Sequence, residues 1–171
     1  MTEEIRAEEI KFMPEIEKVI KDNFGLFPQD ITKLELSTTE EDTRESFDIV
    51  YKSKVEISVR IRNYYALQWG DFTIRGKSKY GGKTEIDKLR EGMGSIYLYA
   101  WKTEDNNHFE SWILVDINKI RPGLRGEDKP DLPFSTRKRM IYNDDETAFY
   151  NYKIQWIKER DGLINYYNIN G

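Results

Sequence analysis

Arginines at close spacing mark the part of the sequence that could do chemistry. Arg60 and Arg62 stand at alternate positions of one apolar run, and Arg75 stands in the same way in the next run. Guanidinium groups suit phosphate because they can donate two parallel hydrogen bonds to it. We expect Arg62, Arg75 and Lys88 to bind a phosphate-bearing ligand, and Arg60 to stabilise the charge that develops on a reacting phosphate.

Carboxylates in the same region could neutralise these arginines or hold a metal ion. Asp48, Glu56 and Glu85 are the candidate ligands, because Mg²⁺ prefers one or two carboxylates plus water and substrate oxygens. A site of Asp48, Glu56, Glu85 and Arg60 would be the catalytic centre of a metal-dependent phosphodiesterase or nuclease. The alternative is a charged outer sheet face with cross-strand ion pairs, in which Asp71 is a further available partner.

The composition excludes several other kinds of site. The 171 residues contain no cysteine and one histidine, His108, which excludes disulfides and thiolate metal sites and makes a Ser–His triad improbable. Aromatic residues make up 13% of the chain and supply the burial that a disordered chain lacks. The length predicts one domain, and the lack of an apolar run or signal core predicts a cytoplasmic protein without a membrane partner.

Charge is unevenly distributed along the chain. Residues 1–48 carry a net charge of −8, residues 49–103 carry +6 and residues 104–171 carry −2, which together give the overall −4. A basic middle in an acidic protein indicates a local anion site and not a surface that is basic throughout. The expected partner is therefore a nucleic acid or a nucleotide.

Period-two alternation predicts the strands that would carry the arginines. Residues 55–62 and 71–75 alternate apolar and polar side chains, as half-buried strands do. We expect these two strands to pair with their apolar faces aligned, so that Arg60, Arg62 and Arg75 point the same way. Helical spacing of apolar residues predicts a helix over 3–23, which Pro14 could kink.

The other elements follow from turn and capping signals. Residues 77–83 form a Gly/Lys/Ser loop, after which Thr84 suits the N-cap of a helix over 85–91 that Gly92 or Gly94 can close. Strands are expected over 96–101, 112–117, 148–157 and 162–169. The prediction is an α+β domain with a mixed central sheet, divided into an N-terminal helix (1–25), a core of sheet and helix (46–121), a long loop (122–145) and C-terminal strands (146–171).

Two groups of aromatic residues allow two interpretations. Such residues could stack on nucleic-acid bases or form part of the core. The first group lies in the expected strand 96–101 and the second between the two arginine-bearing strands; the residues are Tyr97, Tyr99 and Trp101, and Tyr64, Tyr65 and Trp69.

Four segments resemble a family of small proteins from phages and bacteria. They read STTEEDTRESFDIV, VEISVRIRNYY, DFTIRGKSKYGGKTEIDKLREGMGSIYLYAW and WILVDINKIR. The resemblance spans residues 37–121 without a large gap and rests on a VRxR…TIR…TExxK pattern. It implies a phage-type protein; the alternative to a nuclease is then a non-catalytic accessory or anti-defence protein that binds a host protein or sequesters a phosphorylated small ligand.

The order of elements also resembles the PD-(D/E)xK restriction-endonuclease-like superfamily, which implies that fold and a nuclease-like activity. Asp48 would then be the metal-binding aspartate, and Glu15 or Glu17 the acid of the N-terminal helix. Ser58 and Arg60 would occupy the (E/Q)-x-K positions. The chain departs from the motif there, because serine replaces a carboxylate and arginine replaces a lysine that could act as a base. This puts catalysis in doubt, unless Glu56 or Glu85 enters the metal site.

Overall fold

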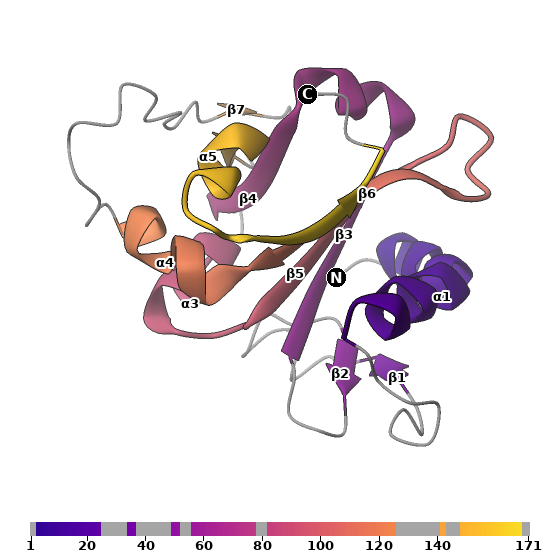
Figure 1. The fold of residues 1–171 in the computed structure, drawn as a ribbon, viewed down its shortest axis with the longest axis horizontal. Coiled ribbons are helices and arrows are strands. Elements are labelled where there is room, and N and C mark those ends of the chain that lie inside the picture. Colours follow the sequence, from indigo (N-terminus) through magenta and orange to yellow (C-terminus); the bar gives the residue numbers. More distant parts are fainter. Residues whose placement is uncertain are drawn as a thin grey trace.

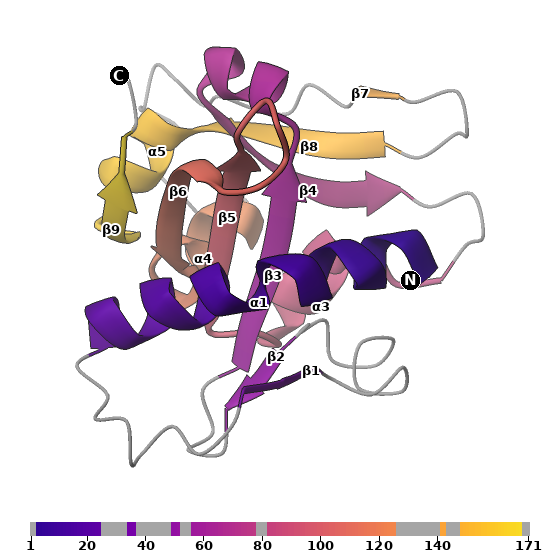
Figure 2. The same cartoon turned by 90° about the vertical axis from the view of Figure 1, so that its right-hand side faces the viewer.

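Two β-sheets face each other across an apolar layer, and a long helix covers the other face of the larger sheet (Figure 1; Figure 2). The computed structural model describes residues 3–24, 34–36, 49–51, 56–77, 82–125, 141–142 and 148–168. In chain order the elements are α1 (Glu3–Phe24), β1 (Leu34–Leu36), β2 (Ile49–Tyr51), β3 (Glu56–Arg62), η1 (a 3₁₀ helix, Tyr64–Trp69), β4 (Asp71–Lys77), α3 (Glu85–Glu91), β5 (Ile96–Lys102), β6 (Phe109–Asp116), α4 (Ile117–Arg125), β7 (Ile141–Tyr142), β8 (Ala148–Lys153), α5 (Ile154–Lys158) and β9 (Leu163–Tyr167).

The larger sheet is mixed, as predicted. Its strand order is β1-β2-β3-β5-β6-β9, and that of the smaller sheet is β4-β8-β7. Strands β3 and β5 run parallel, whereas the other neighbouring strands are antiparallel. A parallel pair needs a crossover connection, and here the crossover contains η1, β4 and α3. The α+β class with an N-terminal helix and a mixed sheet is confirmed.

Helix α1 packs its apolar side against the larger sheet (Figure 2). The helix runs from Glu3 to Phe24 and continues through Pro14. Phe12 is buried and stacks on Phe109 of β6 with ring centroids 5.0 Å apart. The Glu15 carboxylate accepts a hydrogen bond from the Phe109 backbone N–H at 2.6 Å. One end of the β5–β6 hairpin is thereby fixed to the middle of the helix.

The predicted pairing of the two arginine-bearing strands is wrong. Strand β3 lies between β2 and β5, whereas β4 pairs with β8 in the smaller sheet. The cause is the connection: η1 follows β3 directly, and Gly70, in the left-handed conformation with φ 55°, ends η1 and starts β4 on the second sheet. Because the two strands belong to different sheets, Arg75 does not share a sheet face with Arg60 and Arg62.

Helix α3 begins and ends where predicted. The Asp87 carboxylate accepts hydrogen bonds from the backbone N–H and the hydroxyl of Thr84, at 3.0 and 2.7 Å, and so completes a capping box. Gly92 closes the helix with φ 109°. Beyond it, the buried guanidinium of Arg121 donates to the backbone oxygens of Leu89 and Gly94. Helix α4 is thereby attached to the carboxyl end of α3, where a positive charge is favourable.

The C-terminal part contains two helices that the alternation did not predict. The expected strand 148–157 ends at Lys153, and α5 follows because Ile154, Trp156 and Ile157 all turn toward the core. Residues 122–125 of the expected long loop belong instead to α4, which ends at Arg125; residues 126–140 of that prediction lie outside the described residues. The predicted strand at the end of the chain is confirmed as β9.

None of the helices in the described part of the chain combines the length and the apolar character that a membrane span requires.

Burial of Tyr152 predicts that stability falls at high pH. Burial raises the pKa of this phenol to about 12, against about 10 for an unfolded tyrosine. The neutral phenol is therefore favoured by folding, and this contribution is complete below pH 10 and lost as the pH rises toward 12. We expect wild type to lose about 1.4 kcal/mol more than Tyr152→Phe between pH 8 and pH 11, measured by urea unfolding. Equal losses would contradict the assignment.

Candidate functional site

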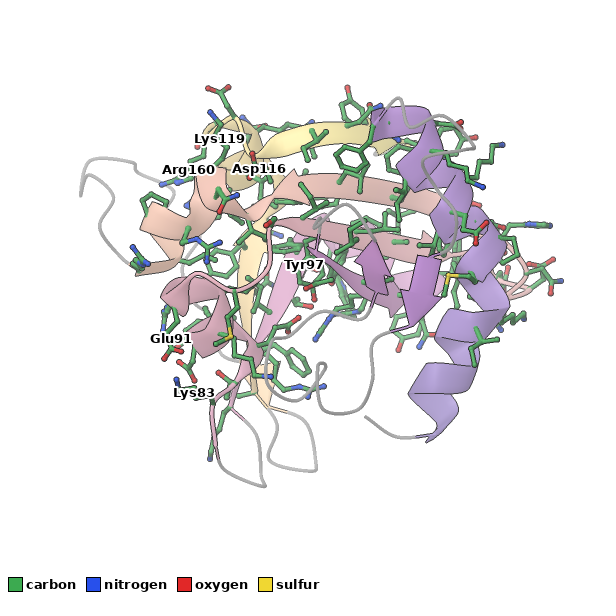
Figure 3. All side chains as sticks on the ribbon, turned by 90° about the horizontal axis from the view of Figure 1, so that it is seen from below. Lys83, Glu91, Tyr97, Asp116, Lys119 and Arg160 are labelled. Carbon is green, nitrogen blue, oxygen red and sulfur yellow. The ribbon has the colours of Figure 1, made fainter. Side chains whose placement is uncertain are left out.

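Arg60 and Arg62 lie on the face of β3 that points toward the smaller sheet. In the parallel register their neighbours on β5 are Tyr99 and Trp101. These two side chains and Tyr97 are at most 1% exposed, and Figure 3 shows Tyr97 in the interior, between strands. The aromatic residues of β5 are thus part of the core, and the two guanidiniums lie at the edge of that core.

Arg60 is paired with Glu85, the first residue of α3. The two charged groups are 2.9 Å apart, and their side chains are only 17% and 18% exposed. The guanidinium also lies over the Phe149 ring, 5.2 Å from its centroid. Burial by itself would lower the pKa of Arg60, but the Glu85 carboxylate and nearby tyrosines raise it above its ordinary value. Arg60 is therefore a permanently charged group whose charge is neutralised within the protein.

Both oxygens of Glu85 already accept hydrogen bonds. Oε2 accepts from Arg60 and, at 2.8 Å, from the backbone N–H of Arg75. Oε1 accepts from the Tyr97 hydroxyl. One carboxylate thus links α3 to β3, β4 and β5, and a metal ion would have to replace these donors in order to bind it.

Arg62 has neutral partners. Its Nη1 donates to Thr73 Oγ1 at 2.6 Å and to the Tyr99 hydroxyl at 3.1 Å, and these two hydroxyls are 2.8 Å apart. No carboxylate of the described residues lies within ion-pair distance of Arg62, and its other nitrogens donate to none of those residues. Arg62 is partly exposed. One nitrogen of the guanidinium, Nη1, is thus anchored, whereas Nη2 and Nε can still donate hydrogen bonds.

Asp71 lies close to Arg62 but does not contact it. Oδ2 of this carboxylate accepts from Asn151 Nδ2 at 2.6 Å, whereas Oδ1 is buried and has no hydrogen-bond partner among the residues that the structure describes. Burial raises the pKa of Asp71 above its ordinary value, although Asn151 and the charge of Arg62 act against this. The indole N–H of Trp101, the β5 neighbour of Arg62, is a buried hydrogen-bond donor that likewise has no acceptor among the described residues. Such groups are rare and need an explanation.

The remaining predicted residues lie elsewhere. The Arg75 side chain is exposed on β4. Lys88, on α3, is only 9% exposed and has an interaction partner within the protein. Lys83 and Glu91 form an exposed ion pair, 2.7 Å long, at the two ends of α3 (Figure 3). Of the predicted phosphate-binding residues, Arg62 is the one on the same strand face as Arg60, whereas Arg75 reaches the Arg60–Glu85 pair only through its backbone N–H.

The predicted metal ligands are not brought together by the described residues. Asp48 and the side chain of Glu56 lie outside the described residues, and Glu85 is engaged as above. In the part of the chain that the structure describes, no three acidic or histidine side chains are grouped so as to hold a metal ion. Glu15, considered as the helix acid, instead contacts His108 Nδ1 at 2.8 Å, on the face of the sheet opposite Arg60. The Mg²⁺ site stays a prediction.

Sequence reasoning missed the neutral partners of Arg62. Thr73 and Asp71 alternate with apolar residues in the expected strand 71–75, and this position on its polar face could have indicated both as neighbours of Arg62. Asn151 comes from a strand 80 residues farther along the chain, and nothing local connects it with Asp71. Comparison of the chain with protein-family models, curated proteins and solved structures gives no match.

The Arg60–Glu85 pair predicts a large cost for removing one partner. We expect Glu85→Gln to lower the free energy of unfolding by about 3 kcal/mol, because it leaves a buried guanidinium without a counter-charge. The matched control is Glu91→Gln, whose pair with Lys83 has side chains 43% and 62% exposed. It should cost no more than about 0.5 kcal/mol. Urea unfolding measures both variants, and equal losses would contradict a structural role for Glu85.

Asp71 predicts a substitution that stabilises. Because its pKa is raised in the folded state, folding favours the protonated acid. The favourable contribution is present below the ordinary pKa of aspartate and is lost as the pH rises through the raised value, so at pH 7 the carboxylate opposes folding. Asp71→Asn can still accept from Asn151, and we expect it to raise the unfolding midpoint at pH 7. The gain should shrink toward pH 4; a loss at pH 7 would contradict the argument.

Proposed function

We propose that the chain binds a phosphate-bearing ligand, a nucleotide or a nucleic acid, with Arg62 as the residue that contacts the phosphate. The observation that carries this proposal is the contrast between two neighbouring arginines. Arg60 is neutralised by a carboxylate at 2.9 Å, whereas Arg62 is held by two hydroxyls and forms an ion pair with no carboxylate of the residues that the structure describes. A partly buried cation without a counter-ion attracts an anion.

The anchoring of Arg62 suits this role. Thr73 and Tyr99 take up Nη1 alone, so Nη2 and Nε still offer donors in the planar geometry that matches phosphate oxygens. A side chain fixed in this way loses little further freedom when it binds a ligand. The net charge of +6 over residues 49–103 also favours an anionic ligand.

Binding without cleavage is the form of the proposal that has the better support. Among the described residues Glu85 is the one predicted metal ligand, and its oxygens accept from Arg60, Arg75 and Tyr97. This donor set does not fit a metal ion as it stands, so we derive no hydrolytic step. A protein that binds or sequesters a phosphorylated ligand is consistent with this arrangement.

Binding of a labelled 12-nucleotide single strand, followed by fluorescence anisotropy, tests the role of Arg62. We expect Arg62→Gln to weaken binding at least tenfold and to reduce the slope of log affinity against log salt by about 1. Arg62→Lys keeps the charge but loses the fork, and it should recover affinity only in part.

The matched control is Arg75→Gln, which removes an exposed arginine of the same charged segment. It should change the affinity less than twofold. Equal weakening by Arg62→Gln and Arg75→Gln would show unspecific attraction and contradict the proposal, as would a wild type that binds neither the strand nor nucleotides. Incubation with Mg²⁺ is a separate arm, in which cleavage that Asp48→Ala abolishes would establish the catalytic form.

A further inference from the structure

Helix η1 presents three aromatic side chains to solvent. Tyr64, Tyr65 and Trp69 are 46%, 58% and 46% exposed. The helix itself is anchored, because Ala66 is buried in the core and Leu67 packs against it. Three large exposed aromatics within six residues form a patch of the kind that marks an interaction site on a soluble protein.

The patch is held in place by hydrogen bonds. The Tyr65 hydroxyl accepts from Asn63 Nδ2 at 3.2 Å, and the Tyr65 carbonyl accepts from Gln68 Nε2 at 2.8 Å. The rings of Tyr65 and Trp69 lie edge to face with centroids 5.9 Å apart. The backbone oxygen of Trp69 accepts from Lys153 Nζ at 2.7 Å. The rings of Tyr65 and Trp69 therefore contact each other before any ligand binds.

The patch adjoins the proposed phosphate contact along the chain. One residue, Asn63, separates Tyr64 from Arg62, and one residue, Gly70, separates Trp69 from Asp71. Helix η1 connects the carboxyl end of β3 with the start of β4, which the two ribbon views show at the same end of the molecule (Figure 1; Figure 2). The two buried polar atoms without partners, on Asp71 and Trp101, belong to this same end of the sheets.

The charges around the patch favour an anionic partner. Arg62 and Lys153 flank it, and the acid next to it, Asp71, is buried and bonded to Asn151. Aromatic rings beside cations are the combination that binds unpaired nucleobases, because the bases stack on the rings while the phosphates meet the cations. A duplex offers no free base faces along its length, so it would gain only the phosphate contacts.

We infer that the ligand is a single-stranded nucleic acid whose bases stack on Tyr64, Tyr65 and Trp69 while a neighbouring phosphate binds Arg62. This inference rests on the proposed function and names the class of ligand. Stacking is sequence-tolerant, since every base has an aromatic face. The predicted preference is therefore for unpaired strands over duplex, with little choice among bases.

Three labelled probes of equal length separate stacking from phosphate binding. They are a 12-nucleotide oligothymidine, a 12-nucleotide strand of abasic sites and a 12-base-pair duplex, each titrated with the full chain at one salt concentration. We expect the oligothymidine to bind at least tenfold more tightly than the abasic strand. Tyr65→Ala and Trp69→Ala should each weaken oligothymidine binding about tenfold and leave the abasic strand unchanged.

The matched control is Tyr166→Ala, which removes a tyrosine that is 50% exposed on β9. It should change no affinity, and circular dichroism shows whether each variant is folded. Trp69→Phe provides a second readout. It keeps a stacking ring, so it should bind oligothymidine as tightly as wild type does. Any quenching of tryptophan emission that oligothymidine causes in wild type should be lost in this variant.

The outcomes distinguish the two proposals. If the abasic strand or the duplex binds as tightly as oligothymidine, and Arg62→Gln still weakens binding, the stacking inference is overturned and the phosphate contact stands. If none of the three probes binds, the stacking inference is overturned, which is the result expected when the patch receives a protein. If nucleotides also fail to bind, the phosphate contact is overturned as well.

Discussion

Two positive charges on the inner face of a central strand are the constraint that organises this protein. Guanidiniums cannot be deprotonated at physiological pH, so each one at the edge of the core must find a counter-charge, acceptors or solvent. For Arg60 the solution is Glu85, and this requirement fixes the start of α3 over β3. The same carboxylate also binds the β4 backbone and the β5 tyrosine. One ion pair thus links α3 to both sheets, in addition to the apolar layer between them.

Arg62 solves the same problem differently, and the proposed function rests on this difference. Hydroxyl groups of Thr73 and Tyr99 hold it without cancelling its charge, and a carboxylate that could have paired with it, Asp71, is bonded to Asn151 instead. Local features that oppose stability are typical of binding sites, where a preorganised but unsatisfied group gains its partner from the ligand.

The sequence predicted what depends on near neighbours and missed what depends on distant ones. Alternation placed Arg60 and Arg62 on one face of β3, and Thr84 and Gly92 indicated the bounds of α3, because strand faces and helix caps are decided within a few residues. The partnership of Arg60 with the helix after the glycine loop was among the options considered. These parts of the fold and site are therefore readable from the chain.

Sheet membership was not readable in the same way. Two alternating runs separated by a short aromatic segment are typical of neighbouring strands, yet η1 and Gly70 send β4 to a second sheet. Period two also continues past Lys153, where burial of Trp156 and Ile157 selects a helix. Pairing of β3 with β5 and of β4 with β8 depends on contacts between distant segments, as does the bond between Asp71 and Asn151, and no local pattern encodes them.

The crossover between the parallel strands has a consequence for how the chain folds. A strand of the smaller sheet is part of the connection that joins β3 to β5, so formation of the parallel pair and formation of the second sheet are coupled through one segment of the chain. Its partner β8 arrives about 75 residues later in the chain, which adds contacts of high sequence separation to the rate-limiting step. Assembly is therefore expected to be cooperative and comparatively slow, with most of the polypeptide needed before either layer becomes stable.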